Sequence, residues 1–101
     1  MTNYQDKVED QKTEEIKTIL TDWNPLGSKA AQVEDLNDYE AEANDIIFFI
    51  DDGLDFPKVG NEQKRITKIV KEILNEAFNL WLTEEDCKEP SIKIMNVVTK
   101  K

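Results

Sequence analysis

The chain has 101 residues, 39% of them hydrophobic and 35% charged, which suits a single domain (1–101) with one modest core and argues against a disordered protein. Its formal net charge of -9 at pH 7 opposes binding to nucleic acid or to an anionic membrane surface. The sequence contains no histidine, so it lacks the usual general base near neutral pH, and we expect that the protein is not an enzyme.

The surplus negative charge is confined to the middle of the chain. Between Lys29 and Lys58 there is no basic residue, and nine acidic residues fall there: Glu34, Asp35, Asp38, Glu40, Glu42, Asp45, Asp51, Asp52 and Asp55. Of the 22 acidic residues, 13 remain elsewhere and are balanced by the 13 basic ones. Because a local negative field attracts cationic surfaces, the sequence predicts a basic protein partner.

The cysteine content and the hydropathy pattern bear on the compartment. Cys87 is the only cysteine, so no internal disulfide can form, which favours a reducing environment. The first residues lack the basic and apolar segments of a signal peptide, and the longest apolar run, Ile46–Ile50, is too short to cross a bilayer. We therefore expect a cytoplasmic protein that does not bind membranes.

The first periodic segment predicts a helix over residues 8–23, with residues 1–7 frayed. Ile16, Ile19, Leu20 and Trp23 follow the spacing of one apolar helix stripe, so Trp23 is expected in the core. The following residues, 24–27, end this helix, because a residue before proline avoids the right-handed helical region and glycine permits a turn. Residues 28–32 then form a connection with at most a short helical turn.

Two further helices are predicted in the middle of the chain. The second starts at residue 35 or 37 and ends at residue 52, with Tyr39, Ala43, Ile46, Ile47 and Ile50 facing inward. The third has Asn61 as its N-cap and an apolar stripe that continues to residue 81: Ile66, Ile69, Val70, Ile73, Leu74, Ala77, Phe78 and Trp81. Its basic residues are expected on the side opposite the apolar stripe, where they partly balance the acidic second helix: Lys64, Arg65, Lys68 and Lys71.

The C-terminal segment is compatible with two structures. Thr83 resembles an N-cap followed by acidic residues, which predicts a helix, whereas Pro90 inside that helix would cost about 3 kcal/mol. The alternation of residues 92–94 resembles a strand, but a lone strand would have no sheet to join. We therefore predict a helix that is kinked or restarted near Pro90, and an all-α fold that is a small bundle of about four helices.

Three short segments carry a resemblance to a known family. They are residues 19–27, residues 39–42 leading into residues 45–47, and residues 81–87. In order and spacing they resemble the YugE-like family of small bacterial domains over residues 10–99. The resemblance implies an all-α fold and no activity, because none is established for that family. Asn24 stands where the family tends to have aspartate, and Pro90 interrupts the last helix.

Candidate sites for catalysis and for metals find little support in the residues. Acidic neighbours surround Cys87 in the sequence and oppose a reactive thiolate, so a buried structural thiol is expected. The acidic run at 51–55 lacks the alternating ligands and the final glutamate of a calcium loop. The three glycines are isolated and form no phosphate loop. We expect no catalytic residue, no cofactor and no metal site.

The outer side of the second helix is the predicted binding surface. At 100° per residue, Glu34, Asp38, Ala41, Asp45, Phe48 and Asp52 lie opposite Tyr39. Carboxylates around a large aromatic side chain are typical of a protein–protein hot spot, and the acidic residues Asp51 and Asp55 extend this set. The alternative is that Phe48 is covered by the C-terminal segment or lies in a helix buried on two sides.

Two hypotheses for the function follow. In the first, the protein is an acidic inhibitor of the immunity type, which neutralises a basic partner such as a toxin nuclease domain. In the second, it is a structural or regulatory adaptor without catalytic activity that self-associates through Phe48. A small enzyme dependent on a metal would require the acidic side chains to converge on a cation.

Overall fold

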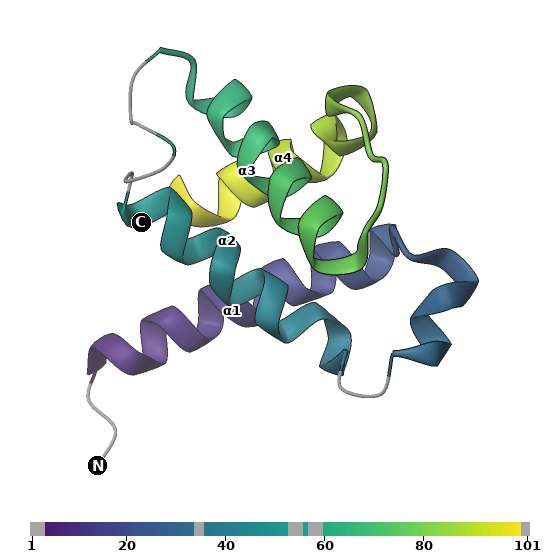
Figure 1. Ribbon diagram of the computed structural model, residues 1–101. Helices are drawn as coiled ribbons and strands as arrows, with labels where there is room; N and C mark the ends of the chain where they lie inside the picture. Colours follow the sequence, from purple (N-terminus) through teal and green to yellow (C-terminus); the bar gives the residue numbers. More distant parts are fainter. Residues whose placement is uncertain (1–3, 34–35, 53–55, 57–59, 100–101) are drawn as a thin grey trace.

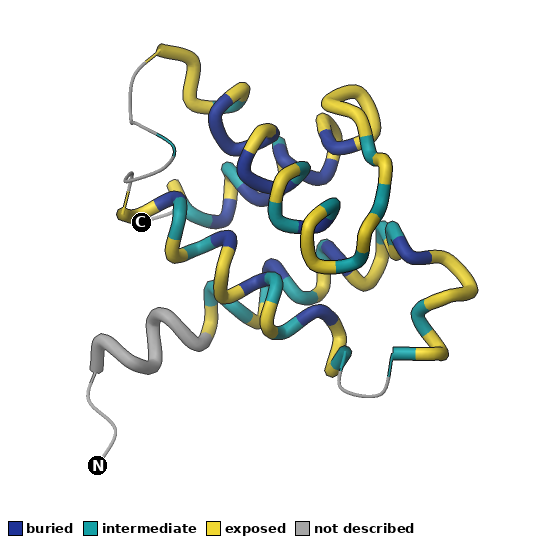
Figure 2. Tube along the Cα trace, viewed as in Figure 1, coloured by how far each residue is buried: buried dark blue, intermediate teal, exposed yellow. Residues whose placement is uncertain are grey.

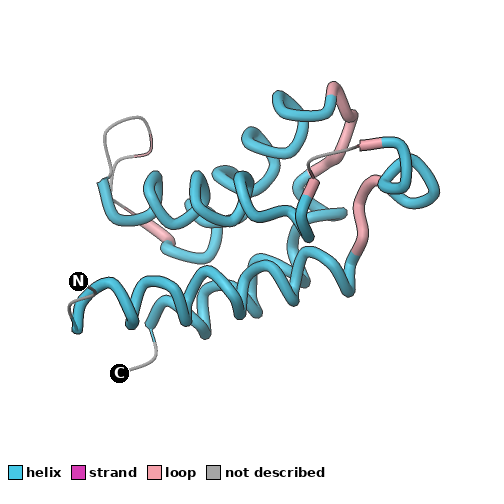
Figure 3. The backbone as a smooth tube through the Cα atoms, turned by 90° about the horizontal axis from the view of Figure 1, so that it is seen from below, coloured by secondary structure: helices cyan, strands magenta, loops and turns pink. Residues whose placement is uncertain are grey.

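The computed structural model describes residues 4–33, 36–52, 56 and 60–99, with side chains from residue 11 onward, and it is all-α. The long helices are α1 (Tyr4–Trp23), α2 (Glu40–Asp52), α3 (Glu62–Phe78) and α4 (Glu84–Thr99). Two short 3₁₀ turns, η1 (Gly27–Gln32) and η2 (Asn37–Tyr39), connect α1 to α2. Figure 3 shows that the rest of the described chain is loop. The predicted small helical bundle is thus confirmed.

The helices pack in a closed ring. Each one contacts the helix before and after it in the chain, and α4 returns to pack against α1. In Figure 1, α1 and α2 cross in the lower half of the view, with α3 and α4 above them. Buried positions recur along all four helices and form one core (Figure 2), whose fully buried members are Ile16, Leu20, Ala43, Ile46, Ile66, Ile69, Val70, Leu74, Cys87 and Ile94.

The turn between α1 and η1 is held by backbone geometry and by one side chain. Asn24 leaves the right-handed helical region, as expected for a residue before Pro25, and adopts a φ of 50°. Its side-chain amide donates a hydrogen bond to the carbonyl of Gly27 at 3.2 Å. The Tyr39 hydroxyl donates to Asn24 Oδ1 at 2.8 Å and accepts from the Leu26 amide at 3.3 Å. The start of α2 is therefore tied to the end of α1.

Both helix caps predicted from the sequence are present. The Asn61 side chain accepts a hydrogen bond from the amide of Lys64 at 3.1 Å and so caps α3. At the start of α4, the Asp86 amide donates to Thr83 Oγ1 and the Thr83 amide donates to Asp86 Oδ2, which is the reciprocal arrangement of a capping box. α4 is a single helix from Glu84 to Thr99 with Pro90 in its interior, so the strand alternative and a helix restarted near Pro90 are both wrong.

The structure corrects the predicted length of the third helix. α3 ends at Phe78, because Asn79 adopts the left-handed conformation with φ 55° and its amide bonds back to the Asn75 carbonyl. Trp81 therefore lies in the loop before α4 and is 91% exposed, not in the core. Ala77, also assigned to the apolar stripe, is exposed. α1 begins at Tyr4, earlier than the predicted Val8.

A second correction concerns Arg65, which was expected on the side of its helix opposite the apolar stripe. Arg65 is only 7% exposed. Its guanidinium donates to the carbonyls of Phe56 at 2.7 Å, Phe49 at 3.2 Å and Ile50 at 2.6 Å, and it forms a two-bond ion pair with Glu62 at 2.9 and 3.1 Å. Arg65 thereby supplies donors to the unpaired carbonyls at the C-terminal end of α2.

Candidate functional site

The outer face of α2 has the exposure that the sequence predicts. α2 begins at Glu40, later than the predicted start at residue 35 or 37, so Asp38 lies in the preceding turn η2. We define the acidic face of α2 as Ala41, Asp45, Phe48, Asp51 and Asp52 of the helix together with Asp38 of η2, and all six residues are exposed. Glu34 and Asp55, the other two predicted members, lie outside the described residues. The inward side of the same helix is buried at Ala43, Ile46 and Ile50. α2 therefore separates an apolar inner side from a charged outer side.

Phe48 is the apolar centre of this face. It is 57% exposed, so neither the C-terminal segment nor a second buried side covers it, and both alternatives for this residue are wrong. Its ring contacts Phe49 edge to face, with the ring centroids 5.3 Å apart. Phe49 in turn contacts Phe56 in the same manner at 5.7 Å. Phe48, Phe49 and Phe56 thus form a row of contacting rings, and this row supports the exposed ring of Phe48.

Three ion pairs of the described chain lie away from the acidic face of α2. They join Lys17 to Glu14, Arg65 to Glu62, and Lys71 to Glu84. Asp38, Asp45 and Asp51 take part in none of these three. Because the charge of Arg65 is matched by Glu62 and buried, it adds little positive field at the surface. The exposed carboxylates of Asp45 and Asp51 therefore present their negative charge to solvent.

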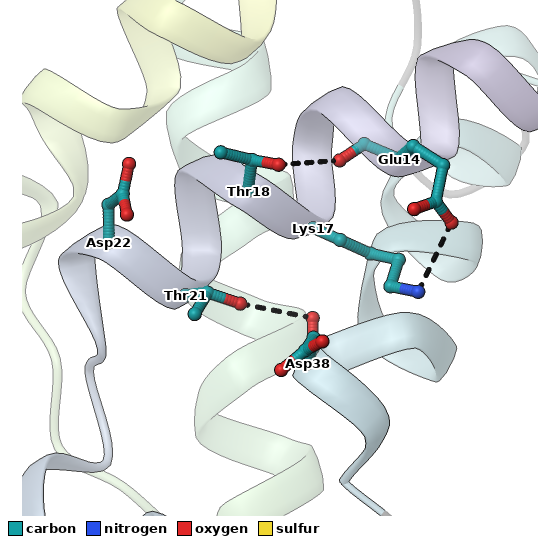
Figure 4. Close-up of a pocket in the computed structure, with 6 residues that line it drawn as sticks. All are labelled: Glu14, Lys17, Thr18, Thr21, Asp22 and Asp38. Atoms are coloured by element: carbon teal, nitrogen blue, oxygen red, sulfur yellow. Dashed lines mark hydrogen bonds and ion pairs between the residues drawn. The ribbon is translucent and has the colours of Figure 1, made fainter.

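A small hollow of about 160 Å³ lies beside the start of this face, between α1 and η2 (Figure 4). Lys17 is its one basic lining residue, and it donates to Glu14 at 3.1 Å. That hydrogen bond, together with the charges of Glu14, Glu40 and Asp38, raises the pKa of Lys17 above its ordinary value. Thr21 Oγ1 donates to the Asp38 carbonyl at 3.4 Å, which joins the two walls.

The described side chains do not assemble a metal site. No group of three or more cysteine, aspartate or glutamate side chains is placed to hold a metal ion within the part of the chain that the structure describes. The hypothesis of a metal-dependent enzyme required such a convergence of carboxylates, so it gains no support from the described residues.

Cys87 is fully buried in the core, in agreement with the prediction of a structural thiol. Burial, aided by the negative charges of Asp86 and Glu84, raises the pKa of the Cys87 thiol from 9.0 to about 11. A thiol with this pKa is almost entirely protonated at neutral pH and is a poor nucleophile.

This shift predicts a loss of stability in alkali. Because the folded state holds the Cys87 proton more tightly than the unfolded state, the contribution is constant below about pH 9 and decreases as the pH rises toward 11. Urea unfolding of the wild-type chain at pH 8, 9 and 10 should therefore show a falling free energy of unfolding. The Cys87→Ala variant should show a smaller decrease over the same range, and equal slopes for the two proteins would contradict the assignment.

The structure also reveals features that sequence periodicity missed. Trp81 lies on a loop that Asn75 holds in place, since the Asn75 side chain accepts from the Leu82 amide at 2.8 Å and donates to the Leu82 carbonyl at 3.1 Å. Asn79, which can adopt the left-handed conformation, was the one local signal that the helix would end before Trp81.

Comparison of the chain with family models, with curated proteins and with solved structures finds no match. The resemblance to the YugE-like family therefore stays a proposal. In the part of the chain that the structure describes, the helices are too short or too polar for any of them to cross a membrane.

Proposed function

We propose that the chain is a small acidic binding protein that recognises a basic protein partner through the acidic face of α2. The observation that carries this proposal is the 57% exposure of Phe48 on a helix face whose charged members are exposed carboxylates. Burial of an aromatic ring at the centre of an interface supplies binding energy, whereas charges around it steer the partner and set specificity.

The charge pattern favours a rapid and salt-dependent association. A focused negative patch raises the rate at which a cationic surface arrives, and salt screens this effect over a Debye length of about 10 Å at 0.1 M. The specific form that we propose is an immunity-type inhibitor of a basic, nuclease-like toxin, acting in the cytoplasm. Such a toxin must carry a cationic surface in order to hold nucleic acid, and the acidic face of α2 has the complementary sign.

The alternative, an adaptor that self-associates through Phe48, is opposed by the same charges. A symmetric dimer through this face would place Asp45 and Asp51 of one copy near those of the other. Like charges brought together in an interface cost several kcal/mol. Phe48 is therefore better suited to a cationic partner than to a second copy of the chain.

The test compares matched variants against one purified partner. The partner is captured from the native host on immobilised wild-type chain at low salt, identified, purified and titrated. Phe48→Ala should weaken its binding at least tenfold, because loss of a hot-spot aromatic typically costs about 2 kcal/mol or more. Trp81→Ala, which removes the other large exposed aromatic side chain, should leave the affinity within about twofold.

A second pair of variants tests the electrostatic component. Asp45→Lys should slow association and reduce its salt dependence, whereas Glu76→Lys makes the same change in net charge at an exposed position of α3. Equal effects of these two variants on the association rate would argue against a specific role for α2. Salt-insensitive dimerisation that Phe48→Ala abolishes would instead establish the adaptor.

A further inference from the structure

A second surface with a distinct shape lies between α1 and α4. It is a groove of about 380 Å³ in which no residue of α2 participates. α1 contributes Ile19, Asp22 and Trp23, and α4 contributes Glu85, Asp86, Glu89, Pro90 and Lys93. Neither the periodicity nor the charge run in the middle of the sequence indicates it, because packing of α4 against α1 creates it.

The apolar part of the groove is fixed by the hydrophobic core. Ile19 and Trp23 pack against the core and are only half-buried, so each keeps part of its side chain accessible from the groove. Pro90 of α4 is buried and also lines the groove. The indole of Trp23 thus packs against the core, as predicted, and also forms part of the groove surface. An aromatic face of this kind attracts cations as well as aliphatic chains.

The charged part of the groove carries an excess of carboxylates. Asp22, Glu85 and Glu89 are exposed, and they take part in none of the three ion pairs given above. Asp86 is already engaged by the amide of Thr83. Lys93 is the single basic lining residue, so four carboxylates face one ammonium group.

We propose that this groove binds a lysine or arginine side chain from a basic protein segment. Such a side chain has an aliphatic stem that suits Ile19, Trp23 and Pro90, and a cationic head that suits Asp22, Glu85 and Glu89. The charge complementarity selects this occupant over a second copy of the chain, which carries the same net charge of -9. A coordinated metal ion is not favoured, because the described carboxylates do not converge as metal ligands do.

The assignment does not depend on the role proposed for α2, and the experiment keeps the two apart. The Trp81→Phe variant leaves Trp23 as the only tryptophan, so its fluorescence reports on the groove. The probe is a short arginine–glycine peptide with blocked ends, and the matched probe has citrulline in place of arginine. The arginine peptide should produce a saturable change in Trp23 emission, and the citrulline peptide should not.

Two triple variants with the same change in net charge locate the binding. Both variants are made in the Trp81→Phe background. The groove variant, Asp22→Asn/Glu85→Gln/Glu89→Gln, should lower the affinity for the arginine peptide at least tenfold. The α2 variant, Asp38→Asn/Asp45→Asn/Asp51→Asn, should change this affinity less than twofold. Lys93→Gln removes the competing ammonium group and should tighten binding about threefold. This gain cannot result from a damaged fold.

Four results would overturn the proposal. They are equal weakening by the two triple variants, equal binding of the citrulline peptide, the same emission change with Mg²⁺ at constant ionic strength, and an emission change that follows dimerisation in sedimentation. Unchanged partner binding in the α2 variants, together with intact binding of the arginine peptide to the groove, would reject only the proposed function. Absence of peptide binding to the groove, together with the expected effects of the α2 variants on partner binding, would reject only the role proposed for the groove.

Discussion

Replacement of Arg65 by methionine should lower the free energy of unfolding by about 3 kcal/mol or more, because hydrogen bonds from a charged donor contribute about 1.5–3 kcal/mol each. The carbonyls of Phe49, Ile50 and Phe56 would lose their charged donor and would have no replacement in the same position. Native stability totals only about 5–15 kcal/mol, so this single side chain accounts for a large share of it.

The effect should be specific to the buried position of Arg65. Lys64, its neighbour on α3, is exposed, and Lys64→Met removes the same charge with an expected change within about 0.5 kcal/mol. Thermal unfolding should separate the two variants, because 1 kcal/mol shifts the melting temperature of a domain of this size by about 4–8 °C. A melting temperature of Arg65→Met close to that of Lys64→Met would show that α2 does not need this cap.

Replacement of Tyr39 by alanine should cost about 3–5 kcal/mol, as for other large aromatic residues truncated in a core. Tyr39 is 2% exposed, and its ring meets that of Phe78 edge to face with centroids 6.0 Å apart. The change would also remove the hydroxyl that joins Asn24 and the Leu26 amide.

Tyr39→Phe separates the hydroxyl from the ring. It keeps the contact with Phe78 but leaves the buried Leu26 amide without its acceptor, so we expect a loss of about 1–3 kcal/mol. Phe48→Ala removes an exposed aromatic and should change stability by no more than about 0.5 kcal/mol. Urea unfolding of the three variants gives the comparison, and a neutral Tyr39→Phe would show that the hydroxyl does not fix the turn.

Tyr39 and Arg65 hold the two ends of α2 in place. Tyr39 ends a run of three residues with positive φ, from Asn37 to Tyr39. Such a backbone costs about 1–2 kcal/mol per residue and persists only where surrounding contacts offset that cost. The buried ring and hydroxyl of Tyr39 provide these contacts at the start of the helix, and Arg65 secures the other end. A helix fixed at both ends loses little conformational entropy on binding, which suits the role proposed for its acidic face.

The four helices, most of their inward faces, the caps at Asn61 and Thr83 and the outward position of the acidic residues of α2 follow from the sequence alone. These features depend on the helical period and on contacts within a few residues, which are local properties of the chain. The exposure of Phe48 was open at the level of the sequence and is a finding of the structure.

The other features depend on contacts between segments that are far apart in the sequence. The helical period places Arg65 on the charged side of α3. It cannot show that the C-terminal end of α2 packs against that side, where its backbone carbonyls accept hydrogen bonds from Arg65. The apolar stripe continues through Trp81, although the backbone turns at Asn79 and exposes the ring. The groove between α1 and α4 depends on two helices more than 60 positions apart in the sequence, a long-range packing that no local pattern encodes.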